Sequence, residues 1–75
     1  MMMDVSTTSS CIEQIGQTAG LVWTALNESG PQSLAKLIKS IDAPRDVVLQ
    51  AIGWLAREDK IWIEETKRVR TIGLR

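Results

Sequence analysis

Apolar residues recur at steps of three and four between residues 10 and 29, which is the spacing of one face of an α-helix. Ser10 and Glu13 fit a capping box, so the helix is predicted to begin at Ser10, and Gly30 followed by Pro31 is predicted to end it. Trp23 widens the apolar face and is predicted to lie in the core. The positions that form the face are Ile12, Ile15, Ala19, Val22 and Leu26.

Two shorter helical patterns follow this first one. Ser33 is suited to cap a helix of about two turns. Pro44 is tolerated only in the first turn of a helix, so it predicts the start of a third helix that runs to about Asp59, capped by Asp42 or Ala43. The apolar positions of the short second helix are Leu34, Leu37, Ile38 and Ile41.

The apolar spacing changes from a helical period to strict alternation after residue 60. Ile61 and Ile63 in one segment, and Ile72 and Leu74 in the next, predict the two strands of a β-hairpin. The turn near residues 66–68 has no Gly or Asn, so a longer loop is predicted in place of a tight two-residue turn. A very short third strand is expected near Gln32-Ser33. The order of elements predicts an α+β winged helix-turn-helix domain: three helices followed by a two-stranded β-hairpin wing.

The length and composition indicate one small globular domain. Residues 1–9 are mostly small and polar after three methionines, so they are predicted to form a mobile tail ahead of a domain at residues 10–75. The chain is 44% hydrophobic and 24% charged, which is typical of soluble proteins. No segment has the roughly 18 apolar residues of a membrane span, and no signal-peptide pattern is present, so a cytoplasmic protein with no membrane partner is expected.

The chain is poor in groups that carry out catalysis. It has one cysteine and no histidine, which argues against internal disulfides and the usual zinc sites. Glu64 and Glu65 are neighbours in a predicted strand and point to opposite faces, so they cannot act as a carboxylate pair. We therefore expect a protein that is not an enzyme and has no cofactor, metal or small-molecule substrate.

Two segments carry a resemblance to a known family. In the first segment the shared residues are Ile15-Gly16, Thr18-Ala19-Gly20, Val22-Trp23 and Leu26. In the second they are Ala51, the run "GWLARE" at residues 53–58, and Lys60-Ile61. In these residues the chain resembles small stand-alone prokaryotic proteins of one winged helix-turn-helix domain, known as domain of unknown function 2582. The resemblance implies a winged-helix fold, a DNA-binding role assigned by analogy of fold, and self-association. The chain departs from the family pattern at the wing, where "TKRV" replaces a glycine-containing turn.

The distribution of charge along the chain indicates that any attraction for nucleic acid comes from a local cluster of basic residues and not from the net charge of the protein. The net charge is zero, but all nine Lys and Arg side chains follow residue 35, while three of the nine acids precede it and six follow it. Helical spacing places Asp46, Gln50, Gly53 and Arg57 on the outward face of the third helix. Gln50 suits adenine and Arg57 suits guanine, so both are candidate readers of bases in double-stranded DNA. The candidate phosphate contacts are Lys36, Lys39, Lys67, Arg68 and Arg70.

A protein interface is the alternative use of the same elements. Gly53 leaves a dent in the outward face, and the neighbouring Trp54 is either folded over the edge of the core or an exposed anchor on a flank shared with Val47. Trp62 is predicted to face away from the core side of the hairpin, which makes it a further interface candidate. Two functions therefore stay open: a DNA-binding module, either transcription-regulator-like or architectural, and a homodimerisation or protein-interaction module that does not bind nucleic acid.

Overall fold

The first helix is longer than its apolar pattern predicts. The computed structural model describes the backbone of residues 2–75 and the side chains from residue 11 onward, and helix α1 spans Met2–Ser29. The prediction that this helix begins at Ser10 is therefore wrong. No Gly or Pro occurs between residues 2 and 15 to interrupt the helix, so Ser10 stays inside it and does not cap it. The mobility of residues 1–9 stays a prediction.

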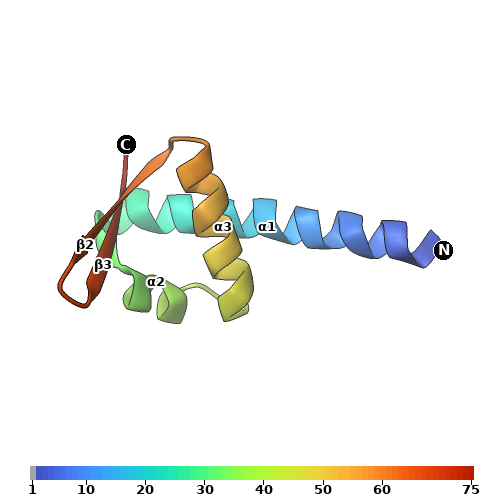
Figure 1. Ribbon diagram of the computed structural model, residues 1–75, viewed down its shortest axis with the longest axis horizontal. Helices are drawn as coiled ribbons and strands as arrows, with labels where there is room; N and C mark the ends of the chain where they lie inside the picture. Colours follow the sequence, from blue (N-terminus) through green and yellow to red (C-terminus); the bar gives the residue numbers. More distant parts are fainter. Residues whose placement is uncertain (1) are drawn as a thin grey trace.

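Only the C-terminal half of α1 packs against the rest of the domain. At 1.5 Å per residue, 28 residues extend about 42 Å, which is nearly the whole 45 Å long axis of the molecule. Figure 1 shows the N-terminal turns of α1 projecting past the other elements. Ala19, Val22 and Leu26 are buried as predicted, whereas Ile12 is largely exposed because its turn lies beyond the body of the domain.

The second and third helices follow the predicted order. Helix α2 spans Leu34–Ser40, and the Ser33 hydroxyl accepts a hydrogen bond from the backbone N–H of Lys36 at 3.2 Å, which confirms Ser33 as its cap. Helix α3 spans Arg45–Arg57. Its N-terminal cap is Pro44, not Asp42 or Ala43, because the extended backbone of Pro44 with φ −59° and ψ 146° leads directly into the first turn.

The strands form one small antiparallel sheet. Its order is β1-β3-β2, and the paired positions Ile63 and Ile72 lie opposite each other in the hairpin. The short third strand is confirmed, since Gln32 pairs with Ile72. The Gln32 side chain donates a hydrogen bond to the Ala25 carbonyl at 3.2 Å and so ties this edge to α1. The strands are β1 (Gln32–Ser33), β2 (Ile61–Thr66) and β3 (Val69–Leu74).

The turn at the tip of the hairpin is tighter than predicted. Thr66 pairs with Val69, so only Lys67 and Arg68 connect the strands. The prediction of a longer loop is wrong because Lys67 adopts φ +55°, a conformation that tight hairpin turns need and that usually selects Gly or Asn.

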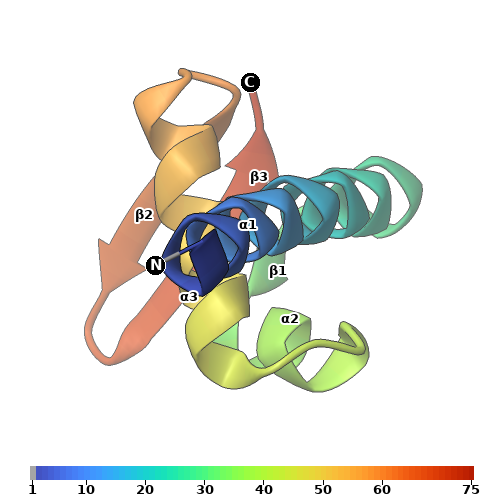
Figure 2. The same ribbon diagram turned by 90° about the vertical axis from the view of Figure 1, so that its right-hand side faces the viewer.

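A single core joins the three helices to one face of the sheet. Figure 2 looks along α1 and shows α2, α3 and the hairpin arranged around it. The fold is a winged helix of the α+β class, as predicted. Among residues 2–75, no helix is both long and apolar enough to cross a membrane. The buried apolar residues are Ala19, Val22, Leu26, Leu37, Ile41, Val48, Ala51, Ile52, Leu55, Ile61 and Ile72.

Candidate nucleic-acid interface

The outward face of α3 has the composition expected from helical spacing. The helix buries Val48, Ala51, Ile52 and Leu55, and it exposes Asp46, Gln50, Gly53 and Arg57. Gln50 and Arg57 are seven residues apart, or about 10 Å along the helix axis. Asp46 accepts a hydrogen bond from the backbone N–H of Val47 at 3.0 Å, so its carboxylate sits at the positive end of the helix dipole. The exposed face of α3 therefore has little net positive charge of its own.

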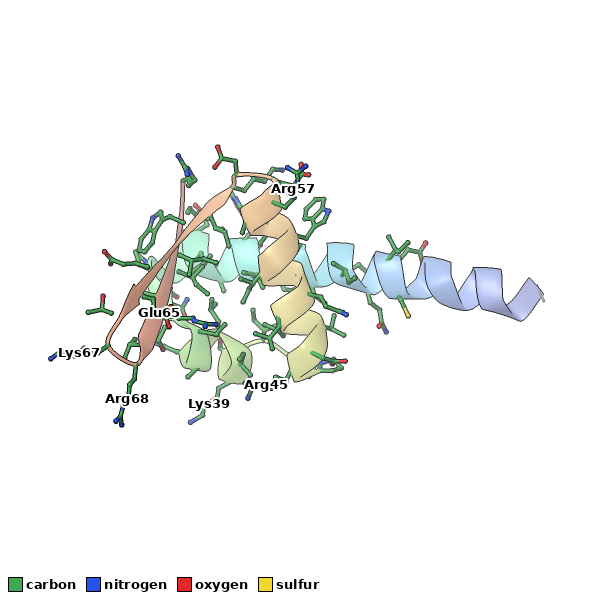
Figure 3. All side chains as sticks on the ribbon, viewed as in Figure 1. Lys39, Arg45, Arg57, Glu65, Lys67 and Arg68 are labelled. Carbon is green, nitrogen blue, oxygen red and sulfur yellow. The ribbon has the colours of Figure 1, made fainter. Side chains whose placement is uncertain are left out.

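Cationic side chains from three elements lie on one side of the domain. In Figure 3, Lys39 of α2, Arg45 at the start of α3 and Arg68 of the hairpin turn point toward the same side, and Lys67 projects outward from the tip of that turn. Arg57 lies at the opposite end of α3. Figures 1 and 2 agree that the hairpin turn is on the same side as α2 and the first turn of α3. Of the predicted phosphate contacts, the structure thus brings Lys39, Lys67 and Arg68 to a common side.

Arg45 is not among the contacts predicted from the sequence. It lines a hollow together with Arg68 and Arg70. Its position in the first turn of α3, directly after the connection from α2, is the signal that could have indicated this location. Lys36 is exposed on α2, and its role as a phosphate contact stays a prediction.

Arg70 differs from the other cations because it has an acidic partner. Its Nε atom lies 3.5 Å from Oε2 of Glu65, and both side chains are more than half exposed. An exposed pair of this kind contributes at most about 1 kcal/mol. Arg70 is therefore a weaker candidate phosphate contact than Lys67 or Arg68, for which no ion pair occurs within the described part of the chain.

Two tryptophans flank a second hollow on the other side of α3. The hollow has a volume of about 400 Å³ and lies between α1 and the C-terminal part of α3. Trp23 is 42% exposed and Trp54 46% exposed. The prediction that Trp23 lies in the core is wrong, because it is about 100° around α1 from the buried Val22 and the small domain does not reach that flank. Trp54 lines the hollow with much of its ring accessible.

The small residues of α1 are uncovered beside these tryptophans. A Cβ atom placed on Gly16 or Gly20 would have nothing within 4 Å outside its own helix. Both glycines line the hollow with Trp23 and Trp54. Packing within the chain therefore does not require glycine at either position.

The remaining interface candidates lie on different surfaces. Gly53 is exposed with open space around it, but it lines a hollow shared with the hairpin and not the hollow of Trp54. Val47 is half-buried. Trp62 lies on the outer face of the hairpin as predicted, yet its ring covers Gly73 in the neighbouring strand and is half-buried there. Gly53 and Trp54 therefore do not form one contact surface.

Comparison with known sequences places these features in a family. The model of the family described as "Winged helix-turn-helix domain (DUF2582)" matches residues 10–74. The chain belongs to this family. The DUF2582 domain described above is also 43% identical over 53 residues to the uncharacterized protein MJ1608 of Methanocaldococcus jannaschii, a match that covers 67% of this chain and 74% of that protein.

A solved structure shares the same fold. The solution NMR structure of protein BT2368 from Bacteroides thetaiotaomicron is similar to this DUF2582 domain with a TM-score of 0.73 and 35% sequence identity. The match covers 83% of this chain and 76% of that one. Neither relative carries a name that states a ligand or an activity, so the function has to be argued from the surface of this chain.

Proposed function

We propose that this DUF2582 domain binds double-stranded DNA through α2, α3 and the wing. The observation that carries the proposal is the common side taken by Lys39, Arg45, Lys67 and Arg68, which come from three separate elements. Phosphate oxygens are the ligands that such a spread of cations suits. Lys36 and Arg70 extend the same set of phosphate contacts.

The proposed binding is dominated by phosphate contacts rather than by base reading. Gln50 and Arg57 are the groups on the outward face of α3 that suit base edges, whereas Asp46 on that face repels phosphate. Contacts to the sugar-phosphate backbone of DNA carry no direct information about the base sequence. We therefore expect an architectural or weakly selective mode, and no catalytic step.

Salt dependence tests this proposal directly. Four to six phosphate contacts predict that the affinity for a labelled duplex falls with a log–log slope of about four to five as salt is raised. The double variant Lys67→Glu, Arg68→Glu is expected to lose at least tenfold in affinity and about two units of slope. Fluorescence anisotropy at increasing salt measures both quantities.

A matched control separates local contacts from net charge. Lys60 and Arg75 lie at the open end of the hairpin, where the Arg75 N–H donates to the Lys60 carbonyl at 3.0 Å. The variant Lys60→Glu, Arg75→Glu changes the net charge by the same amount far from the turn, and it should retain most of the affinity. It also removes the 3.0 Å ion pair of Arg75 with Asp59 and alters a residue of the tryptophan hollow, so its melting temperature and its mass in solution are measured alongside. Absence of binding at about 50 mM salt, the low end of the usual range, would rule out the DNA proposal.

The exposed tryptophans favour a second candidate function, self-association. A second copy that packs its α1 across Gly16 and Gly20 would cover Trp23 and Trp54, which are large anchors of the type enriched in interfaces. This surface shares no residue with the proposed DNA contacts, so a homodimer and a DNA-binding module are compatible. Without DNA binding, the same surface would support a pure interaction module.

If the domain self-associates, its average molecular mass in solution should rise with protein concentration, and this rise should require the rings of Trp23 and Trp54. Trp23→Ala with Trp54→Ala is expected to weaken the dimer by at least tenfold, as measured by sedimentation equilibrium. Leu21→Ala, at a similarly exposed position of α1 outside the hollow, and Gly53→Leu, on the other side of α3, should leave the dimer intact. A mass that stays monomeric at all concentrations would contradict this candidate.

A further inference from the structure

Two adjacent hollows lie between the helices and the hairpin. Two hollows of about 450 and 380 Å³, both open to solvent, share Leu34, Glu65 and Arg70. The first extends along α2 toward the hairpin turn, and the second extends along α3 toward Ile72. Because they share three lining residues, the two hollows are adjacent, and we call them together the wing groove.

The floor of the wing groove is apolar and accessible. Leu49 of α3 is 37% exposed and Ile63 of β2 47%. They are joined there by half-buried Leu34 and Ile38 of α2. Apolar side chains gathered in one groove, and not scattered singly, mark a binding surface. The phosphates of the proposed DNA contact are polar, so they give this floor no use.

Gly53 makes the groove deeper beside α3. A Cβ at this position would meet nothing within 4 Å, so no packing within the domain requires glycine there. Glycine in a helix interior costs roughly 1 kcal/mol relative to alanine. An occupant that comes close to the backbone of α3 gives a reason for keeping it.

The rim of the groove is positively charged. Arg45, Arg68 and Arg70 border it, and Glu65 is the acidic residue among the lining side chains. Glu65 is paired with Arg70. Neither Arg45 nor Arg68 has an ion-pair partner among the described residues. The groove is therefore complementary to a ligand with an apolar face and flanking carboxylates.

We propose that the wing groove binds an amphipathic acidic helix of a partner protein. Its apolar face would lie on Leu34, Leu49 and Ile63, and its carboxylates would meet Arg45 and Arg68. An amphipathic helix in an apolar groove is a recurring mode of recognition, read through side chains spaced at three, four and seven residues. Addition of a strand to the free edge of β2 is less suited, because Glu64 and Glu65 place negative charge along that strand.

The proposed helix would also exclude DNA. Arg45 and Arg68 serve both ligands, so a helix seated in the wing groove competes with phosphates for the same guanidinium groups. This competition rests on the proposed function, whereas binding of the helix does not. The partner would act as a negative regulator of DNA binding.

A synthetic peptide tests the groove without knowledge of the natural partner. The probe is a fluorescein-labelled helical peptide of about four turns, with leucines along one face and glutamates on the flanks. Its control has the same composition in an order that breaks the apolar face. We expect the first peptide to bind at least tenfold more tightly than the second.

Three variants locate the binding. Leu49→Ser with Ile63→Ser removes the floor and should weaken peptide binding by at least tenfold, while duplex binding at low salt stays unchanged. Gly53→Leu fills the groove and should weaken the peptide as much, with a melting temperature equal to or above that of the parent because leucine is a good helix former. Leu21→Ser, a similarly exposed position on α1 outside the groove, should leave peptide binding unchanged.

The outcomes separate this inference from the DNA proposal. Equal binding of the two peptides, or no effect of the floor variants, overturns the wing groove as a helix site. A floor variant that loses duplex and peptide affinity together also overturns it, since the floor would then belong to the DNA contact. Peptide binding without duplex binding supports the groove and rejects the DNA proposal, and displacement of bound duplex by the peptide supports both.

Discussion

Replacing Leu37 with alanine is expected to remove about 3 kcal/mol from the free energy of unfolding. Leu37 is fully buried in α2 within the core that joins the three helices to the sheet. Truncation removes its transfer free energy and leaves a cavity that a close-packed interior fills poorly. A domain of 75 residues has a total stability of only about 4–11 kcal/mol, so this loss is a large part of the whole. Urea denaturation followed by tryptophan fluorescence measures it.

The matched control is Leu21→Ala on α1. Leu21 is about half exposed, so the same chemical change there should cost well under about 1 kcal/mol. A similar loss at the two positions would mean that α2 does not pack as described. The comparison matters for function because α2 carries Lys36 and Lys39 and borders the wing groove.

Replacing Gly73 with valine is expected to destabilise the domain by about 2 kcal/mol. Valine is otherwise favoured in strands, so propensity alone predicts the opposite sign. The loss arises because a Cβ at position 73 would overlap the Trp62 indole, which lies across the paired position in the neighbouring strand. The ring must then move away from the sheet and give up its contact. Thermal or urea denaturation shows the change.

A double-mutant cycle isolates the contact between Trp62 and Gly73. With Trp62→Ala in the background, Gly73→Val should become neutral or slightly stabilising, since the obstacle is gone and the strand gains a β-branched residue. Equal destabilisation with and without the Trp62 ring would contradict this account. The same result would reopen Trp62 as an interface anchor, because its ring would then be free of the sheet.

The order of elements was predictable because each one carries its own local signal. Ser33 followed by a helical apolar pattern indicated α2, and Pro44 indicated the start of α3. The alternation around Ile63 and Ile72 predicted paired strands. Period and capping act over a few residues, so one sequence suffices to find them.

The candidate surfaces were only partly predictable because they depend on how distant elements approach. Helical spacing placed Gly53 outward, but its neighbours across the wing groove follow from the tilt of the hairpin. The position of Arg45 in the lining of the groove could not be predicted for the same reason. Trp23 was predicted to lie in the core from the apolar face of its helix, while its exposure follows from how far the domain extends over α1. The relative placement of helices and strands cannot be predicted from the residue pattern of any one of them.

At Lys67 in the hairpin turn, the residue that would best stabilise the fold differs from the residue that gives the turn its positive charge. A side chain at positive φ costs roughly 1–2 kcal/mol relative to glycine, and the chain accepts this cost at Lys67. Stability engineering by the usual rules of turn chemistry would choose Gly or Asn there first. That choice would produce a sturdier domain whose wing tip has one positive charge fewer, so a thermostabilised version of this protein would be a poor substitute for the parent in an assay of DNA binding.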